Sequence, residues 1–80
     1  MTNLEVKTEL QIIFKEIFNF KSDLVETMTA QDVRGWDSLN HIRLMVRIQR
    51  KLKIHLTTSE LTEFKNIGEL IALIARKKIK

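Results

Sequence analysis

The residues most able to do chemistry lie in one short run, Gly35-Trp36-Asp37-Ser38-Leu39, near the middle of the chain. Asp37 is a favourable N-cap residue, so a helix is predicted to begin at Ser38. The Ser38 hydroxyl would then stand in the first turn, where free backbone N–H groups and the positive end of the helix dipole favour a bound or attached phosphate. By position alone, an ordinary serine at a helix start is the more common case.

Two other chemistries fit this region poorly. A serine hydrolase could pair Ser38 with His41 one turn later, but no orienting group or oxyanion hole is evident, and the run Gly-x-Ser-x-Gly is absent. His41 and His55 could bind a metal, but they are isolated from other ligand types and the chain contains no cysteine. We therefore expect no catalytic residue and no metal site.

Helices must position this run. The 80 residues include no proline and only two glycines, and their hydrophobic fraction of 44% suits a small globular core. Apolar periodicity and capping residues predict helices over 3–19, 38–52, 59–64 and 67–78. A long loop between the first two helices is expected to lie across the core. The expected fold is all-α: a small four-helix bundle, three long helices and one short, in a single domain over 1–80.

The same periodicity predicts which helix faces are buried. The first helix should bury a stripe formed by Val6, Leu10, Ile13, Phe14 and Ile17. The helix over 38–52 should bury Leu39, Ile42, Val46 and Leu52. Its opposite face carries Asn40, Arg43, Arg47 and Arg50. The last helix should bury Ile67, Leu70, Ile71 and Ile74.

The net charge of +4 is unevenly distributed. Residues 1–37 carry 4 basic and 7 acidic side chains, whereas residues 38–59 carry 5 basic side chains and no acidic one. A basic helix face of this kind is usually plain solvated surface, but it is also typical of small nucleic-acid-binding proteins. Any function that uses the basic charge should therefore involve the middle of the chain.

Asp37-Ser38-Leu39, at the start of the second predicted helix, resembles the phosphopantetheine attachment motif of acyl carrier proteins. The resemblance covers nearly the whole chain, because the helix order, the long loop, a Thr-x-x-Glu start and a final Asn-Ile-Gly-Glu-Leu helix follow the family's order and spacing. It implies that Ser38 carries 4′-phosphopantetheine, supported by Asp37 and Leu39. A phosphopantetheinyl transferase would add this arm from coenzyme A with Mg²⁺. The chain would then hold acyl groups as thioesters and would not itself be an enzyme.

One departure from the family concerns charge. Acyl carrier proteins of fatty-acid synthesis are acidic on helix two, their usual docking surface, whereas this helix is basic. The Gly-Trp-Asp-Ser-Leu form, with Trp36 before the motif, looks more like carriers of specialised polyketide, nonribosomal peptide or surface-polysaccharide pathways. The residues expected to dock partners are Asn40, Arg43, Met45, Arg47 and Arg50. Their partner enzymes should present an acidic or apolar docking surface.

The aliphatic residues behind helix two are core residues first, and the resemblance implies that the same core shelters an acyl chain. The candidates are Val46, Leu56, Phe64, Ile67 and Leu70. No apolar run is long enough to span a bilayer and no signal peptide is evident, so we expect a cytoplasmic monomer without stable membrane insertion. Nucleic-acid binding is kept as the alternative function, although the serine motif makes it the weaker one.

Overall fold

The computed structural model describes residues 2–78. Within this range the regular structure consists of α-helices and 3₁₀ turns, without a strand, which confirms the all-α prediction. The elements, in chain order, are α1 (Asn3–Phe18), a 3₁₀ turn over Ala30–Asp32, α2 (Ser38–Leu52), a 3₁₀ turn over Glu60–Thr62 and α3 (Ile67–Lys77). The short helix expected over 59–64 is thus a single 3₁₀ turn.

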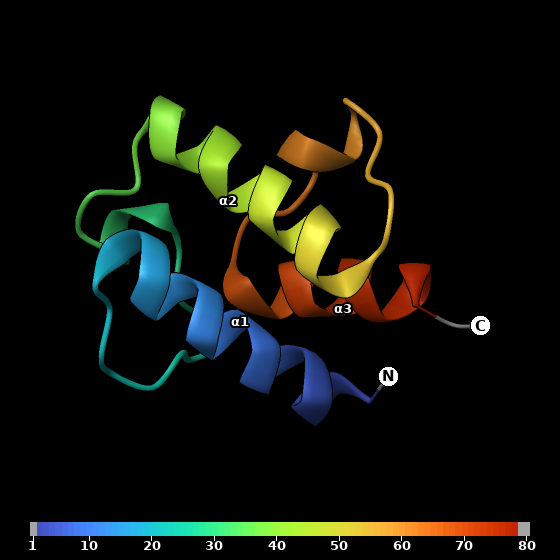
Figure 1. Ribbon diagram of the computed structural model, residues 1–80. Helices are drawn as coiled ribbons and strands as arrows, with labels where there is room; N and C mark the ends of the chain where they lie inside the picture. The colour runs from blue at the N-terminus through green and yellow to red at the C-terminus, as the bar shows by residue number, and fades with distance from the viewer. Residues whose placement is uncertain (1, 79–80) are drawn as a thin grey trace.

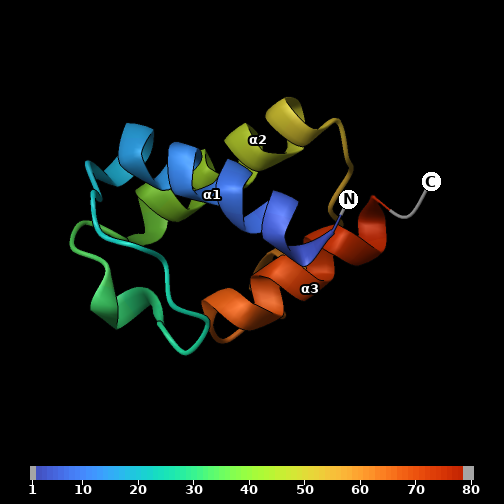
Figure 2. The same ribbon diagram turned by 90° about the horizontal axis from the view of Figure 1, so that it is seen from below.

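The three helices form a small bundle in which α1 packs against both α2 and α3 (Figure 1). The start of α1 and the end of α3 lie at the same end of the bundle in both views (Figures 1 and 2). The start of α2 lies at the opposite end, where the long loop arrives from the end of α1. The serine motif therefore lies at the end of the bundle opposite the start of α1 and the end of α3.

Local capping explains where the helices begin. The Thr2 hydroxyl accepts a hydrogen bond from the backbone N–H of Glu5, and the Glu5 carboxylate accepts one from the backbone N–H of Thr2. This reciprocal capping box satisfies two N–H groups that have no partner inside the helix. At α3 the Asn66 side chain accepts from the Glu69 N–H, but the Glu69 carboxylate accepts from Lys65 instead of from the cap residue.

The core is built from one face of each helix, and the predicted faces of α1 and α3 are correct. The predicted face of α2 is correct at Leu52 and wrong at its other three positions. The α2 side chains that are buried are Leu44, Met45, Ile48 and Leu52. Those left largely exposed are Leu39, Ile42 and Val46. The helix thus carries apolar side chains on two sides, and only one of these sides packs into the core formed with α1 and α3.

The long loop is attached to α1 through the Gln11 side chain. The Gln11 amide donates to the carbonyl of Ser22 at 2.6 Å, and its oxygen accepts from the backbone N–H of Leu24 at 2.9 Å. Leu24 and Val33 are buried in the core, as expected for a loop that lies across the bundle.

A second attachment joins the same loop to the start of α3. The backbone N–H groups of Ile67 and Gly68 donate to the carbonyls of Met28 and Glu26, both at 2.9 Å. A Cβ placed on Gly68 would lie 3.2 Å from the Glu26 Cβ, so glycine permits this close approach. The loop is therefore held by backbone hydrogen bonds to a helix that is distant in sequence.

The connection from α2 to α3 is held in a similar way. The Gln49 side chain accepts from the backbone N–H of Leu56 at 3.0 Å, and Leu56 is buried. Thr57 and Glu60 form the expected capping box, and the Lys77 ammonium group lies 2.7 Å from the Glu60 carboxylate. The hydrogen bond from Lys77, followed by that from the Thr57 backbone, lowers the pKa of Glu60 to about 2.

Candidate functional site

Ser38 is the first residue of α2, and its side chain is exposed. The carboxylate of Asp37 accepts a hydrogen bond from the backbone N–H of Asn40 at 2.9 Å. The backbone carbonyl of Asp37 accepts one from the backbone N–H of His41 at 2.8 Å. Asp37 is therefore the N-cap, as predicted. The Ser38 hydroxyl takes no part in this cap.

The backbone before Ser38 makes a tight turn that presents the serine. Gly35 has a φ of 89°, in the region that glycine adopts without strain. Its carbonyl accepts from the Asn40 side-chain amide at 2.8 Å and from the Asp37 N–H at 3.0 Å. Asn40 thus joins the turn to the first turn of α2, a positional role that differs from the predicted role in docking.

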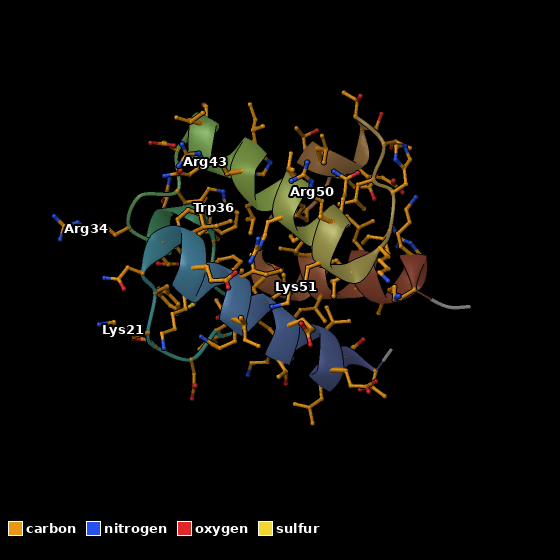
Figure 3. All side chains as sticks on the ribbon, in the orientation of Figure 1. Lys21, Arg34, Trp36, Arg43, Arg50 and Lys51 are labelled. Atoms are coloured by element: carbon orange, nitrogen blue, oxygen red, sulfur yellow. The ribbon has the colours of Figure 1, made fainter. Side chains whose placement is uncertain are left out.

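Trp36 and His41 form a chain of hydrogen bonds beside the serine (Figure 3 labels Trp36). The Trp36 indole N–H lies 3.0 Å from His41 Nδ1, and His41 Nε2 lies 2.9 Å from the Leu61 carbonyl. Because an indole nitrogen only donates, Nδ1 accepts, and the neutral imidazole carries its proton on Nε2. Both nitrogens are therefore engaged, since Nδ1 joins α2 to Trp36 in the loop and Nε2 joins it to the segment around Leu61. His41 is not placed to act as a base for Ser38 or as a metal ligand.

An aromatic cluster surrounds this hydrogen-bond chain. The Trp36 ring lies 5.4 Å from that of Phe14 and 5.7 Å from that of Phe18, which fixes the loop against α1. On its other side the rings of His41 and Phe64 stack at 5.8 Å. Such contacts stabilise each pair beyond simple burial. Sequence reasoning missed this role of His41, because its separation from Trp36 follows no helical period.

An open pocket of about 610 Å³ adjoins Ser38. It is lined by Ala30, Trp36, Asp37, Ser38, His41, Ile42, Leu61, Thr62 and Phe64. The wall is largely apolar and aromatic, with the exposed serine at its edge. These residues fit a flexible arm attached at Ser38, because the arm could extend along this wall without displacing the core.

The remaining predicted residues fall into two groups. Leu39 is 62% exposed beside the serine, while Leu56, Ile67 and Leu70 are buried core residues. Phe64 is partly buried and reaches the pocket.

Two predicted positions are corrected. Met45, expected at the docking surface, is only 2% exposed, and Val46, expected in the core, is 43% exposed. Both errors follow from the choice of the wrong apolar stripe on α2. Arg43, Arg47 and Arg50 are exposed as expected.

Within residues 2–78, no group of three or more histidine, aspartate or glutamate side chains is arranged to hold a metal ion. None of the helices described there combines the length and apolar character needed to cross a membrane.

Comparisons with known proteins agree with this geometry. Residues 9–74 match the family described as the phosphopantetheine attachment site. The chain is also similar to the solution NMR structure of a holo acyl carrier protein from Geobacter metallireducens, with 33% identity and a TM-score of 0.82 over 90% of this chain and 84% of that one. No curated protein gives a significant match. The chain therefore belongs to the phosphopantetheine attachment family, whose members are carrier proteins modified by phosphopantetheinyl transferases and not enzymes.

Proposed function

We propose that this chain is an acyl carrier protein whose 4′-phosphopantetheine arm is attached to Ser38. The observation that carries the proposal is the placement of Ser38, exposed at the start of α2 and at the edge of an aromatic-walled pocket. The arm, once attached, supplies a thiol that holds acyl groups as thioesters. The chain's own contribution is to present the serine, cap the helix behind it through Asp37, and offer the apolar wall of Trp36 and Phe64.

The attachment step is a phosphoryl transfer. The Ser38 Oγ attacks the phosphorus that carries the pantetheine in coenzyme A, forming a new O–P bond. The bond from this phosphorus to the bridging oxygen breaks, adenosine 3′,5′-bisphosphate leaves, and the serine proton is lost to solvent or to a base of the transferase. The Mg²⁺ ion belongs to the transferase, so the carrier needs only an accessible hydroxyl.

Intact mass spectrometry after incubation with a phosphopantetheinyl transferase, coenzyme A and Mg²⁺ tests the proposal. The unmodified protein should gain the mass of one phosphopantetheine unit, and Ser38→Ala should fold but gain nothing. The matched control is Ser22→Ala/Ser59→Ala, which removes the other two serines of the chain. This control should be modified normally. A folded Ser38→Ala protein that still gains the mass would refute the assignment.

We further propose that the carrier serves a specialised pathway whose enzymes present acidic or apolar docking surfaces. The support is α2, which carries Arg43, Arg47, Arg50 and Lys51 and no acidic side chain, together with Trp36 before the motif. Enzymes that serve acidic carriers should repel this helix. The triple variant Arg43→Glu/Arg47→Glu/Arg50→Glu should gain turnover with such an enzyme. Unchanged turnover would contradict the proposal.

Two smaller proposals complete this function. Residues 1–80 form one carrier domain that works as a cytoplasmic monomer. An acyl chain on the arm enters beside Phe64 and reaches the core at Leu56, Ile67 and Leu70. NMR spectra of acylated and unacylated holo-protein should then differ at these core residues, whereas shifts confined to α2 would place the acyl chain outside.

A further inference from the structure

A second hollow lies on the other side of α2 and contains no part of the serine motif. This groove, of about 620 Å³, runs between α1 and α2 and is lined by Glu16, Ile17, Ile42, Arg43, Val46, Arg47 and Arg50. Its floor is aliphatic, and its α2 edge carries three guanidinium groups. We propose that this amphipathic groove binds an acidic amphipathic helix of a partner enzyme. The proposal rests on the proposed carrier function and assigns a partner class to it.

The charges of the groove favour an anionic partner. The Arg47 guanidinium lies 2.8 Å from the Glu16 carboxylate, and the Lys51 ammonium group lies 3.6 Å from that of Glu9. Within the described residues, Arg43 and Arg50 form no ion pair with an acidic side chain (Figure 3 shows both along α2). These two cations are therefore available to carboxylates of a docking partner.

The spacing of the arginines suits a helix. Arg43, Arg47 and Arg50 follow one another at four and three residues, so they extend roughly 10 Å along α2. Carboxylates at the same spacing on a partner helix would lie in one row on its surface. Ile42 and Val46, which are 60% and 43% exposed, form a parallel apolar row that could receive aliphatic anchors of the partner.

The groove also lies in the right place for a carrier. Ile42 lines both this groove and the pocket at Ser38, so the two hollows meet at one side chain. A helix seated in the groove would bring the rest of its enzyme to the arm without covering the serine. A nucleic-acid backbone fits less well, because it leaves the aliphatic floor unfilled and approaches the Glu16 carboxylate.

Binding of two synthetic helical peptides to the unmodified Ser38→Ala protein tests the inference. The peptides share one leucine stripe, flanked by glutamates in one and by lysines in the other. Titration followed by amide NMR should show that the acidic peptide binds and shifts the resonances of residues 42–50, whereas the basic peptide does not. Raising the salt concentration should weaken the binding.

Charge reversal locates the site. Arg43→Glu/Arg50→Glu should weaken binding of the acidic peptide roughly tenfold or more. The matched control is Lys7→Glu/Lys21→Glu, an equal charge change at one residue of α1 and one of the long loop, neither of which lines the groove. It should change binding less than about twofold. Ile42→Ser should weaken binding about fivefold through loss of the apolar anchor. All variants change side chains outside the buried core, and circular dichroism checks that they fold.

Any of three results would overturn the inference. The basic peptide could bind as tightly as the acidic one, or the arginine reversal could weaken binding no more than the control does. A DNA duplex could also bind the groove more tightly than the acidic peptide. Because Ser38→Ala cannot carry the arm, peptide binding is independent of modification. If the protein gains no phosphopantetheine mass but binds the acidic peptide, only the carrier function is refuted. If it gains the mass but does not bind the peptide, only the role of the groove is refuted.

Discussion

At the residue scale, Asp37 stabilises the start of α2 by accepting the Asn40 N–H. Asp37→Ala removes this acceptor and should lower the free energy of unfolding by about 0.5–2 kcal/mol. Urea denaturation followed by circular dichroism measures the change. Asp37→Asn, which keeps an oxygen acceptor, should lie close to the wild-type value, and equal losses in the two variants would contradict the capping role.

The hydrogen bond from Trp36 to His41 gives a second prediction at this scale. Trp36→Phe keeps an aromatic ring in the cluster but removes the N–H donor, leaving His41 Nδ1 without that partner. The free energy of unfolding should fall by about 0.5–1.5 kcal/mol, in addition to any loss from poorer packing. Ring ¹⁵N chemical shifts of the wild-type protein should show the proton on Nε2 of His41. The exposed His55 serves as an internal reference, and identical tautomer mixtures at both histidines would contradict the assignment.

At the scale of elements, the helix boundaries were predictable because caps are local. The structure places α1 over Asn3–Phe18, α2 over Ser38–Leu52 and α3 over Ile67–Lys77, each within one residue of the prediction. The Ser38 position could be read from the motif for the same reason. The buried face of α2 could not be predicted in this way, because the helix has apolar side chains on two sides. Which side is buried depends on the side chains of α1 and α3 that pack against it.

The 3₁₀ turn over Glu60–Thr62 leads to a prediction about pH. The pKa of Glu60 is lowered in the folded state from its ordinary value of 4.5 to about 2, chiefly by the hydrogen bond from Lys77. A lowered folded-state pKa means that the unfolded state binds the proton more readily. The stabilisation is therefore present above about pH 4.5 and is lost as the pH falls towards 2.

Glu60→Gln tests this directly. The free energy of unfolding of the wild-type protein should fall over this pH range more steeply than that of the variant. Glu63→Gln is a matched control, because Glu63 also pairs with α3 through Arg76 but at 3.3 Å on an exposed surface. Parallel pH profiles for wild type and Glu60→Gln would rule out the role of Glu60.

At the scale of the whole molecule, one tryptophan contacts several elements at once. Trp36 lies against Phe14 and Phe18 of α1, His41 of α2 and Phe64 before α3. If residues 1–80 form a single domain, Trp36 fluorescence and helical circular dichroism should change in the same urea transition. The free energy of unfolding should fall by about 1 kcal/mol per molar urea. Two separate transitions would show that part of the chain unfolds independently.

The attachment of the long loop to α3 has a consequence for the order in which the protein folds and unfolds. The hydrogen bonds from Ile67 and Gly68 to Met28 and Glu26 join residues about 40 positions apart, so they can form only once a long loop has closed. These bonds are expected to form after the transition state. Gly68→Ala, which crowds Glu26, should therefore mainly accelerate unfolding in stopped-flow measurements and leave the folding rate nearly unchanged. The segment that presents the serine motif would then be the last part of the protein to become ordered and the first to open.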